Sequence, residues 1–261
     1  MSRMPVLFIG HGSPMNAIED NKFTKEWKKI AAKIPTPKAV LVISAHWVTK
    51  GIKVLDDAKP KMTYDIYGFP EELYKIVYNS PGATELAHRI QNLVNQDVTI
   101  DNSWGYDHGN WSVLKHMYPN CDIPVIQLSL DWSLSANEHY EIGKQLKTLR
   151  DEGVLIIGSG NVVHNLRMID WNNENSGYKW ADEFDKFIKD SILSKSHHKI
   201  INYKLNEKTA TLAVPTTEHY NPLLYVLGAS SEEDIVSICN DTRVMGSLSM
   251  TSYLFETNNN N

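Results

Sequence analysis

Cysteine is scarce in this 261-residue chain, which contains only Cys121 and Cys239. The two lie far apart and neither belongs to a CxxC pair. The sequence therefore indicates neither a disulfide framework nor a zinc site built from thiolates. We expect both residues to be reduced structural thiols, because free cysteine behaves as a small hydrophobic residue in protein interiors.

An excess of positive charge is also missing. The 26 lysines and arginines are outnumbered by 31 acidic residues, which gives a formal net charge of -5. A chain with this balance has no general attraction to nucleic acid or to anionic lipid. We therefore expect no nucleic-acid partner and a small, neutral or moderately polar substrate.

Long apolar runs are absent as well. The first run ends at Gly10 and is too short for the apolar region of a signal peptide or for a membrane span. We therefore expect a cytoplasmic protein without membrane contact. Because no repeat or interdomain linker interrupts the chain, we also expect a single domain over residues 1–257 and a disordered tail over 258–261, where four asparagines follow one another.

The chain does contain a series of apolar runs that alternate with amphipathic segments. Continuous runs at 6–9, 39–43, 123–130 and 154–157 are typical of strands that are covered on both faces. Helical spacing of apolar residues predicts helices over 20–33, 83–95, 135–150 and 176–193. This alternation predicts an α/β fold with a mostly parallel sheet flanked by helices. Segments 209–214, 234–238 and 247–255 predict further strands, the last two as an antiparallel edge that makes the sheet mixed.

Histidines recur at or shortly after the predicted strands. His11 and His46 lie at the ends of the first two, His164 follows the glycine turn after residues 154–157, and His219 lies shortly beyond the strand predicted at 209–214. Ligands in open α/β sheets collect at the carboxyl ends of strands. We therefore expect the four imidazoles to converge on one metal ion.

A fifth histidine, His108, occupies a dense segment, residues 104–111, in which two glycines and two tryptophans surround it. Such a segment predicts a tight turn that presents an imidazole between rigid aromatic walls. The alternative is a histidine that is merely hydrogen-bonded within a loop. His139, in the first turn of a predicted helix, is expected to face solvent.

The predicted ligands do not determine which metal is bound. Four neutral imidazoles suit tetrahedral Zn²⁺, whereas two histidines and a carboxylate such as Glu218, with open positions, suit iron(II). Zinc has no redox chemistry, so a zinc site favours a hydrolase that uses a metal-bound water and a nearby base. Iron(II) favours reaction with dioxygen. A non-catalytic protein that keeps the metal pocket for recognition is a third alternative.

Six motifs of the chain resemble those of the class III extradiol ring-cleavage dioxygenases, most closely their single-chain 4,5-DOPA extradiol dioxygenase branch. They occur in order over nearly the whole sequence. The motifs are Gly-His-Gly-Ser-Pro-Met at 10–15, Ser-Ala-His-Trp at 44–47, Tyr-Gly-Phe-Pro at 67–70, Gly-Tyr-Asp-His-Gly-Asn-Trp at 105–111, Gly-Ser-Gly at 158–160 with His-Asn-Leu at 164–166, and Glu-His-Tyr at 218–220 with Pro-Leu at 222–223.

The resemblance implies a LigB-like three-layer α/β fold with one divalent metal per chain, and opening of the ring of DOPA or a similar catechol by dioxygen. It implies His108 as the catalytic acid–base residue, and as metal ligands His11, His46, His164 and His219. Fe²⁺ is the metal expected for turnover. Zn²⁺ is expected in the isolated protein, because histidine sites generally bind zinc more tightly than iron(II). Tyr106 stands where the family has a smaller aliphatic residue, which changes the expected shape of the pocket rather than the reaction.

The motifs also suggest how a catechol ring is bound. A few aromatic side chains can form a flat apolar slot for the ring. The candidates are Trp47, Tyr64, Tyr67, Phe69, Trp104 and Trp111. As candidate substrate-binding residues we name Ser13, Tyr67, Asn161 and Tyr220.

Overall fold

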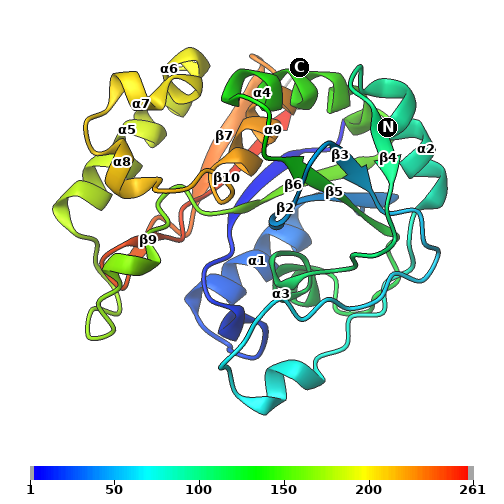
Figure 1. Ribbon diagram of the computed structural model, residues 1–261, viewed down its shortest axis with the longest axis horizontal. Coiled ribbons are helices and arrows are strands. Elements are labelled where there is room, and N and C mark those ends of the chain that lie inside the picture. Colours follow the sequence, from blue (N-terminus) through cyan, green and yellow to red (C-terminus); the bar gives the residue numbers. More distant parts are fainter. Residues whose placement is uncertain (1–2, 258–261) are drawn as a thin grey trace.

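The computed structural model describes residues 3–257, so the tail predicted at 258–261 lies outside the described residues. Within that range the chain forms an eight-stranded sheet with helices on both faces (Figure 1). The strands are β1 Val6–Gly10, β2 Ala39–Thr49, β3 Ile52–Val54, β4 Val98–Ile100, β5 Val125–Asp131, β6 Val154–Gly160, β7 Asp234–Cys239 and β10 Ser252–Thr257, and a separate pair is formed by β8 Arg243–Val244 and β9 Leu248–Ser249.

The helices connect and cover these strands. The α-helices are α1 Lys22–Lys33, α2 Thr84–Leu93, α3 His108–Met117, α4 Ala136–Leu146, α5 Lys179–Leu193, α6 His197–Ile201, α7 Tyr203–Asn206, α8 Ala210–Ala213 and α9 Asn221–Ala229. Short 3-10 helices are η1 Pro14–Ala17, η2 Glu71–Lys75, η3 Lys147–Arg150 and η4 Leu166–Met168. Within residues 3–257, no helix is both long and apolar enough to cross a membrane.

The sheet is mixed, with the strand order β4-β3-β5-β2-β6-β1-β10-β7. The four neighbouring strands β5, β2, β6 and β1 are parallel, whereas β10 is antiparallel to both β1 and β7. This confirms the predicted α/β architecture and its antiparallel edge. The parallel strands bring their carboxyl ends to one edge of the sheet, where the histidine motifs follow.

The sheet is buried because helices cover both of its faces. On one face, α9 packs on β6, β1 and β2, and α4 covers α9. Gly143 and Gly228 let these two helices approach closely, since a Cβ atom at Gly228 would lie 2.1 Å from the carbonyl oxygen of Tyr140. On the other face α3 packs against β2 and α1 packs against α3, while α5 to α8 lie together beyond β7 and β10 (Figure 1). The apolar core is therefore continuous through the sheet.

Strand β2 is irregular where its histidine motif lies. Ile43 pairs with Leu128 of β5, but Val48 pairs with Leu130, so β2 holds extra residues between these two pairs. A bulge of this kind bends a strand and changes the direction of its side chains. His46 lies within this irregular stretch, near the carboxyl ends of the central strands, where the other histidines gather.

The prediction of a strand at 209–214 is wrong, because Ala210–Ala213 forms the short helix α8. The segment contains two alanines among small apolar residues, and alanine has the highest helix propensity. Its apolar pattern was too short to distinguish a strand from a helical turn.

The expectation that His139 faces solvent is also wrong. Its side chain is fully buried between α4 and α9. Nε2 lies 3.1 Å from the side-chain nitrogen of Asn221, which donates to it, so Nδ1 carries the proton and donates to the Tyr225 hydroxyl at 3.1 Å. Burial lowers the pKa of His139 to about 4, so the imidazole is held in its neutral form.

This burial makes the folded protein sensitive to acid. Because the folded-state pKa lies below the value of the unfolded chain, the unfolded state binds the proton first, and stability is lost as the pH falls from 6.5 towards 4. We expect His139→Gln to remove a dependence of up to about 1.4 kcal/mol per pH unit. The measurement is the free energy of unfolding in urea at pH 7 and pH 5. The exposed His88→Gln should behave like the wild type, and parallel pH profiles for wild type and His139→Gln would contradict this account.

Candidate metal centre

Histidines from five separate elements meet at the carboxyl ends of the central strands. His11 follows β1, His46 lies in β2, His164 follows β6, His108 begins α3 and His219 precedes α9. Ring centroids of His11 and His46 are 5.1 Å apart, those of His11 and His219 are 5.3 Å apart, and those of His46 and His219 are 4.9 Å apart. The structure thus brings together the side chains that the strand pattern indicated.

Three of these residues form a compact donor group. One ring nitrogen from each of His11, His46 and His219 lies within 4.8 Å of those of the other two. The Nε2 atoms of His11 and His46 are only 3.1 Å apart. Two metal–nitrogen bonds of about 2.1 Å can span such a separation.

Hydrogen bonds determine which nitrogen of His11 is free. The Ser159 hydroxyl donates to the Gly109 carbonyl at 2.6 Å, so its oxygen accepts from Nδ1–H of His11 at 3.0 Å. Nε2 of His11 therefore carries a lone pair.

The same holds for His46. Its Nδ1 lies 3.2 Å from a carboxylate oxygen of Asp65, an environment that favours a proton on Nδ1 and a lone pair on Nε2. Nε2 of His46 lies 3.1 Å from Nε2 of His11, which is a hydrogen bond when His46 carries its proton on Nε2. With the proton on Nδ1 instead, both Nε2 lone pairs are directed at one point, which fits a bound divalent metal.

Burial keeps these imidazoles neutral. Loss of hydration lowers the pKa values of His11, His46 and His219 well below the usual value, and neighbouring histidines lower them further. Burial lowers the pKa of His164 to about 4. Neutral imidazole is the form that binds metal, because a protonated ring has no lone pair to donate.

The fourth predicted ligand, His164, packs against His219. The two rings stack face to face, with centroids 3.4 Å apart and an interplanar angle of 7°. Within the described chain, the nitrogens of His164 group with Glu218 and His219 rather than with His11 and His46. Its ligation of the metal stays a prediction.

His108 lies beside the donor group without being part of it. Its ring centroid is 3.7 Å from that of His46. Nδ1 donates to Asp65 at 2.8 Å, and the backbone N–H of His108 donates to the other oxygen of the same carboxylate at 2.9 Å. The Nε2 atom remains available as a proton acceptor.

Asp65 is the site residue that the sequence prediction missed. It is a single acidic residue in a loop rich in aromatic residues, a pattern that indicates no particular site. Burial raises its pKa, but the hydrogen bonds and charges of His108 and His46 outweigh this effect and leave the pKa lowered overall. In the sequence, Asp65 is distinguished only by its position two residues before the first residue of the Tyr-Gly-Phe-Pro motif.

Asp107 fixes the start of the helix that carries His108. It caps α3 and accepts hydrogen bonds from Ser44 at 2.7 Å, from the indole of Trp104 at 3.1 Å and from the amide of Gln127. Burial raises its pKa to about 6. Because these partners come from β2, β5 and the loop before α3, Asp107 joins the helix to the sheet.

The four candidate substrate residues differ in their placement. Ser13 caps η1 by accepting from Met15, and Tyr220 is buried with its hydroxyl donating to Ile200, so both polar groups serve the scaffold. Tyr67 is 92 % exposed and does not pack against the histidines. Asn161 is buried and donates to Ser249, while its side-chain oxygen has no partner within the described chain.

The aromatic residues are also divided between site and scaffold. Trp111 is buried, with its ring centroid 6.3 Å from that of His108 and 6.2 Å from that of Tyr64, so these rings form an apolar wall beside His108. Tyr106 donates to the carbonyl of Val125 at 2.8 Å. Because Val125 begins β5, the Tyr106 side chain points away from the edge that carries the histidines. Its hydroxyl therefore does not belong to the group of histidines.

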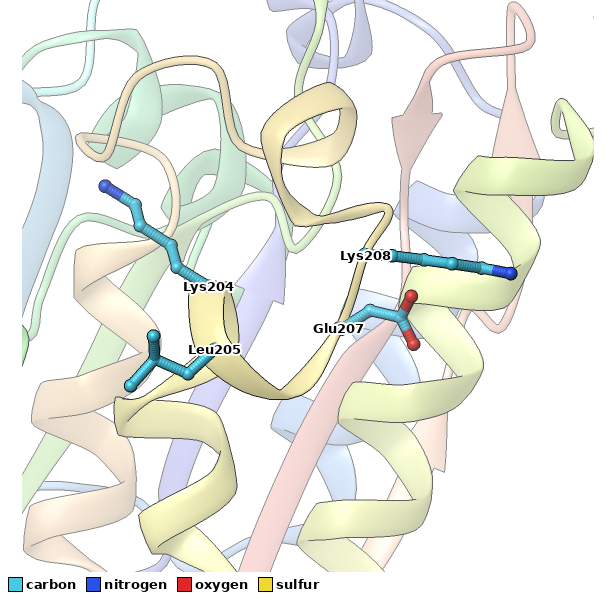
Figure 2. Close-up of a pocket in the computed structure, with 4 residues that line it drawn as sticks. All are labelled: Lys204, Leu205, Glu207 and Lys208. Carbon is cyan, nitrogen blue, oxygen red and sulfur yellow. The ribbon is translucent and has the colours of Figure 1, made fainter.

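A surface hollow elsewhere carries none of the predicted chemistry. It lies at α7 and the connection to α8 and is lined by Lys204, Leu205, Glu207 and Lys208 (Figure 2). Figure 2 shows that Lys204 and Leu205 project away from Glu207 and Lys208 rather than converging on a common point. None of the predicted site residues lines this hollow.

Comparisons with known proteins agree with the geometry. A family model described as the catalytic LigB subunit of aromatic ring-opening dioxygenase matches residues 4–256. A 4,5-DOPA dioxygenase extradiol of Escherichia coli K12 is 46% identical over 96% of this chain and 94% of its own, and one of Beta vulgaris is 39% identical over 95% of each. A crystal structure of an uncharacterized E. coli K12 protein has a TM-score of 0.85 and 44% identity, covering 97% of this chain and 99% of its own.

The hydrogen bond from His11 to Ser159 gives a test of the donor group. We expect Ser159→Ala to raise the dissociation constant for Zn²⁺ by about 10–100-fold, because the His11 ring loses the partner that orients it and keeps Nε2 unprotonated. Competition with a chromogenic chelator measures this constant. Ser129→Ala, at a buried serine of β5, is the matched control and should bind Zn²⁺ like the wild type. Equal affinity in Ser159→Ala and wild type would refute the assignment of His11.

Proposed function

Because the chain belongs to the LigB family of aromatic ring-opening dioxygenases, we propose that it opens the ring of DOPA or a related catechol with dioxygen. The observation that carries the proposal is the position of His108 beside, but outside, the group formed by His11, His46 and His219. A site that only held a metal would have no need of a fifth imidazole that keeps a free acceptor nitrogen.

The donor group defines where the metal would be held. We assign His11, His46 and His219 as ligands, with His164 as a fourth. When bound, the metal supplies positive charge that favours ionised catechol oxygens and, as iron(II), redox contact between the ring and dioxygen. Fe²⁺ is proposed for turnover, and Zn²⁺ for the protein as isolated.

His108 supplies proton transfer. With Nδ1–H held by Asp65, Nε2 accepts a proton from a catechol hydroxyl and later returns it as the ring opens. A positioned acid–base group of this kind contributes about 10²–10⁴-fold to the rate. The buried ring of Trp111 lies beside this imidazole, and His108 is itself buried, which limits the access of water to the proton that passes between substrate and His108.

Of the four candidate substrate contacts, Asn161 is best supported by the structure. Its side-chain oxygen is buried and lacks a hydrogen-bond donor within the described chain, whereas the hydroxyls of Ser13 and Tyr220 already have partners. A buried acceptor without a donor is costly. We propose that a substrate hydroxyl or amine satisfies it.

A zinc-dependent hydrolase is the second candidate. The observation that favours it is the donor set of histidines alone, which suits Zn²⁺, with His108 as a base for a bound water. The two candidates differ in the metal and in the need for oxygen. A non-catalytic binding protein would use neither His108 nor oxygen.

Removal of His108 should separate chemistry from metal binding. We expect His108→Ala to lower kcat by about 10²–10⁴-fold, because proton transfer is lost, while metal content stays at the wild-type level. The measurements are oxygen uptake with L-DOPA after anaerobic reconstitution with Fe²⁺, and elemental analysis. His88→Ala, at an exposed histidine of α2, should retain full activity. A wild-type protein that consumes no oxygen across a panel of catechols would refute the dioxygenase assignment.

Metal removal should distinguish the two candidate enzymes. Dialysis against dipicolinate should abolish oxygen uptake, and Fe²⁺ should restore it whereas Zn²⁺ should not, because zinc has no redox chemistry. Oxygen uptake and ester hydrolysis are measured on the same samples. Hydrolysis restored by Zn²⁺ without oxygen would favour the hydrolase instead.

A further inference from the structure

We infer that Asp65 is a positioning residue that orients His46 and His108 together and keeps the proton of each imidazole on Nδ1. The role of His108 in this inference rests on the proposed function, whereas the effect on His46 concerns metal binding alone. Asp65 lies in the loop between β3 and η2, far in sequence from both histidines.

The geometry joins all three residues through one oxygen atom. Oδ2 of Asp65 lies 2.8 Å from Nδ1 of His108 and 3.2 Å from Nδ1 of His46. Oδ1 accepts the backbone N–H of His108 at 2.9 Å, so the carboxylate also holds the first residue of α3. Only about a tenth of the Asp65 side chain is exposed, which limits competition from water.

The carboxylate acts on the tautomer of both rings. Its hydrogen bond places the proton of His108 on Nδ1, and its charge, 3.2 Å from Nδ1 of His46, attracts an N–H there and repels a lone pair, which favours the same tautomer in that ring. The Nε2 atom of His46 is then free to bind metal beside that of His11, and the Nε2 atom of His108 is free to accept a substrate proton. Carboxylate–histidine–metal arrangements of this kind orient the ring as well as select its tautomer.

The contacts of Asp65 also argue against a purely structural role. Within residues 3–257, every polar contact of its carboxylate goes to His46 or His108. Asp107, by contrast, has partners on β2, β5 and the loop before α3, and so joins elements of the scaffold. Asp65 instead couples the orientation of a proposed metal ligand to that of the proposed acid–base residue.

Asp65→Asn tests the inference with little change of shape. We expect Zn²⁺ affinity of the metal-free protein to fall about 10–100-fold, since the partner of His46 is weakened. We also expect kcat with the iron-loaded protein to fall, measured at saturating Fe²⁺. Asp65→Glu should recover part of both losses. Glu71→Gln, at an exposed carboxylate of η2, is the matched control and should bind Zn²⁺ like the wild type.

Two further measurements separate positioning from loss of structure. Long-range ¹H–¹⁵N spectra of the histidine rings report tautomers directly, and Asp65→Asn should convert His108 from a single Nδ1–H form to a mixture. In a His108→Ala background, Asp65→Asn should still weaken Zn²⁺ binding but should lower kcat no further at saturating Fe²⁺. A structural role alone would lower kcat equally in both backgrounds.

The inference is overturned if Asp65→Asn keeps wild-type Zn²⁺ affinity and an unchanged His108 tautomer. A loss of stability in thermal melting of that variant would not change this conclusion, because it would show only a structural role. A wild-type protein that binds metal but turns over no catechol refutes the proposed function. The Zn²⁺ affinity and tautomer measurements would still decide the role of Asp65 in that case.

Discussion

The close approach of two buried imidazoles, with their Nε2 atoms 3.1 Å apart, is the constraint on which the site depends. Ser159 holds the ring of His11, and Asp65 faces the ring of His46. Protonation is opposed by burial, which lowers both pKa values. The fold therefore keeps two neutral imidazoles side by side, and neutral imidazole is the form that binds a metal ion.

The parallel centre of the sheet and the convergence of its histidines were predictable because their signals are local. An apolar run followed by glycine and histidine specifies a strand and the residue at its end, and parallel strands bring such ends to one edge. His11 and His46 follow from this reasoning alone. His108 required the resemblance to a family, because nothing in residues 104–111 distinguishes a catalytic imidazole from one that is bonded within a loop.

What could not be predicted depends on contacts between distant segments. Asp65 lies in a loop without regular structure, and only the folded chain brings it to His46 and His108. The burial of His139 depends on the close packing of α4 on α9, which periodicity within α4 does not reveal. Closeness in sequence does not imply a place in the site either. Tyr220 directly follows His219, but its hydroxyl donates to the carbonyl of Ile200 in the core.

The three members of the donor group come from opposite ends of the chain: His11 follows the first strand, whereas His219 precedes the last helix. A nascent chain that emerges from the ribosome carries His11 and His46 early but acquires His219 only near the end of synthesis. Domains fold as units during synthesis, so a complete donor group exists only after α9 has docked on β1, β2 and β6. The site is therefore assembled late, and its first histidine, His11, waits for a residue that lies more than two hundred positions further along the chain.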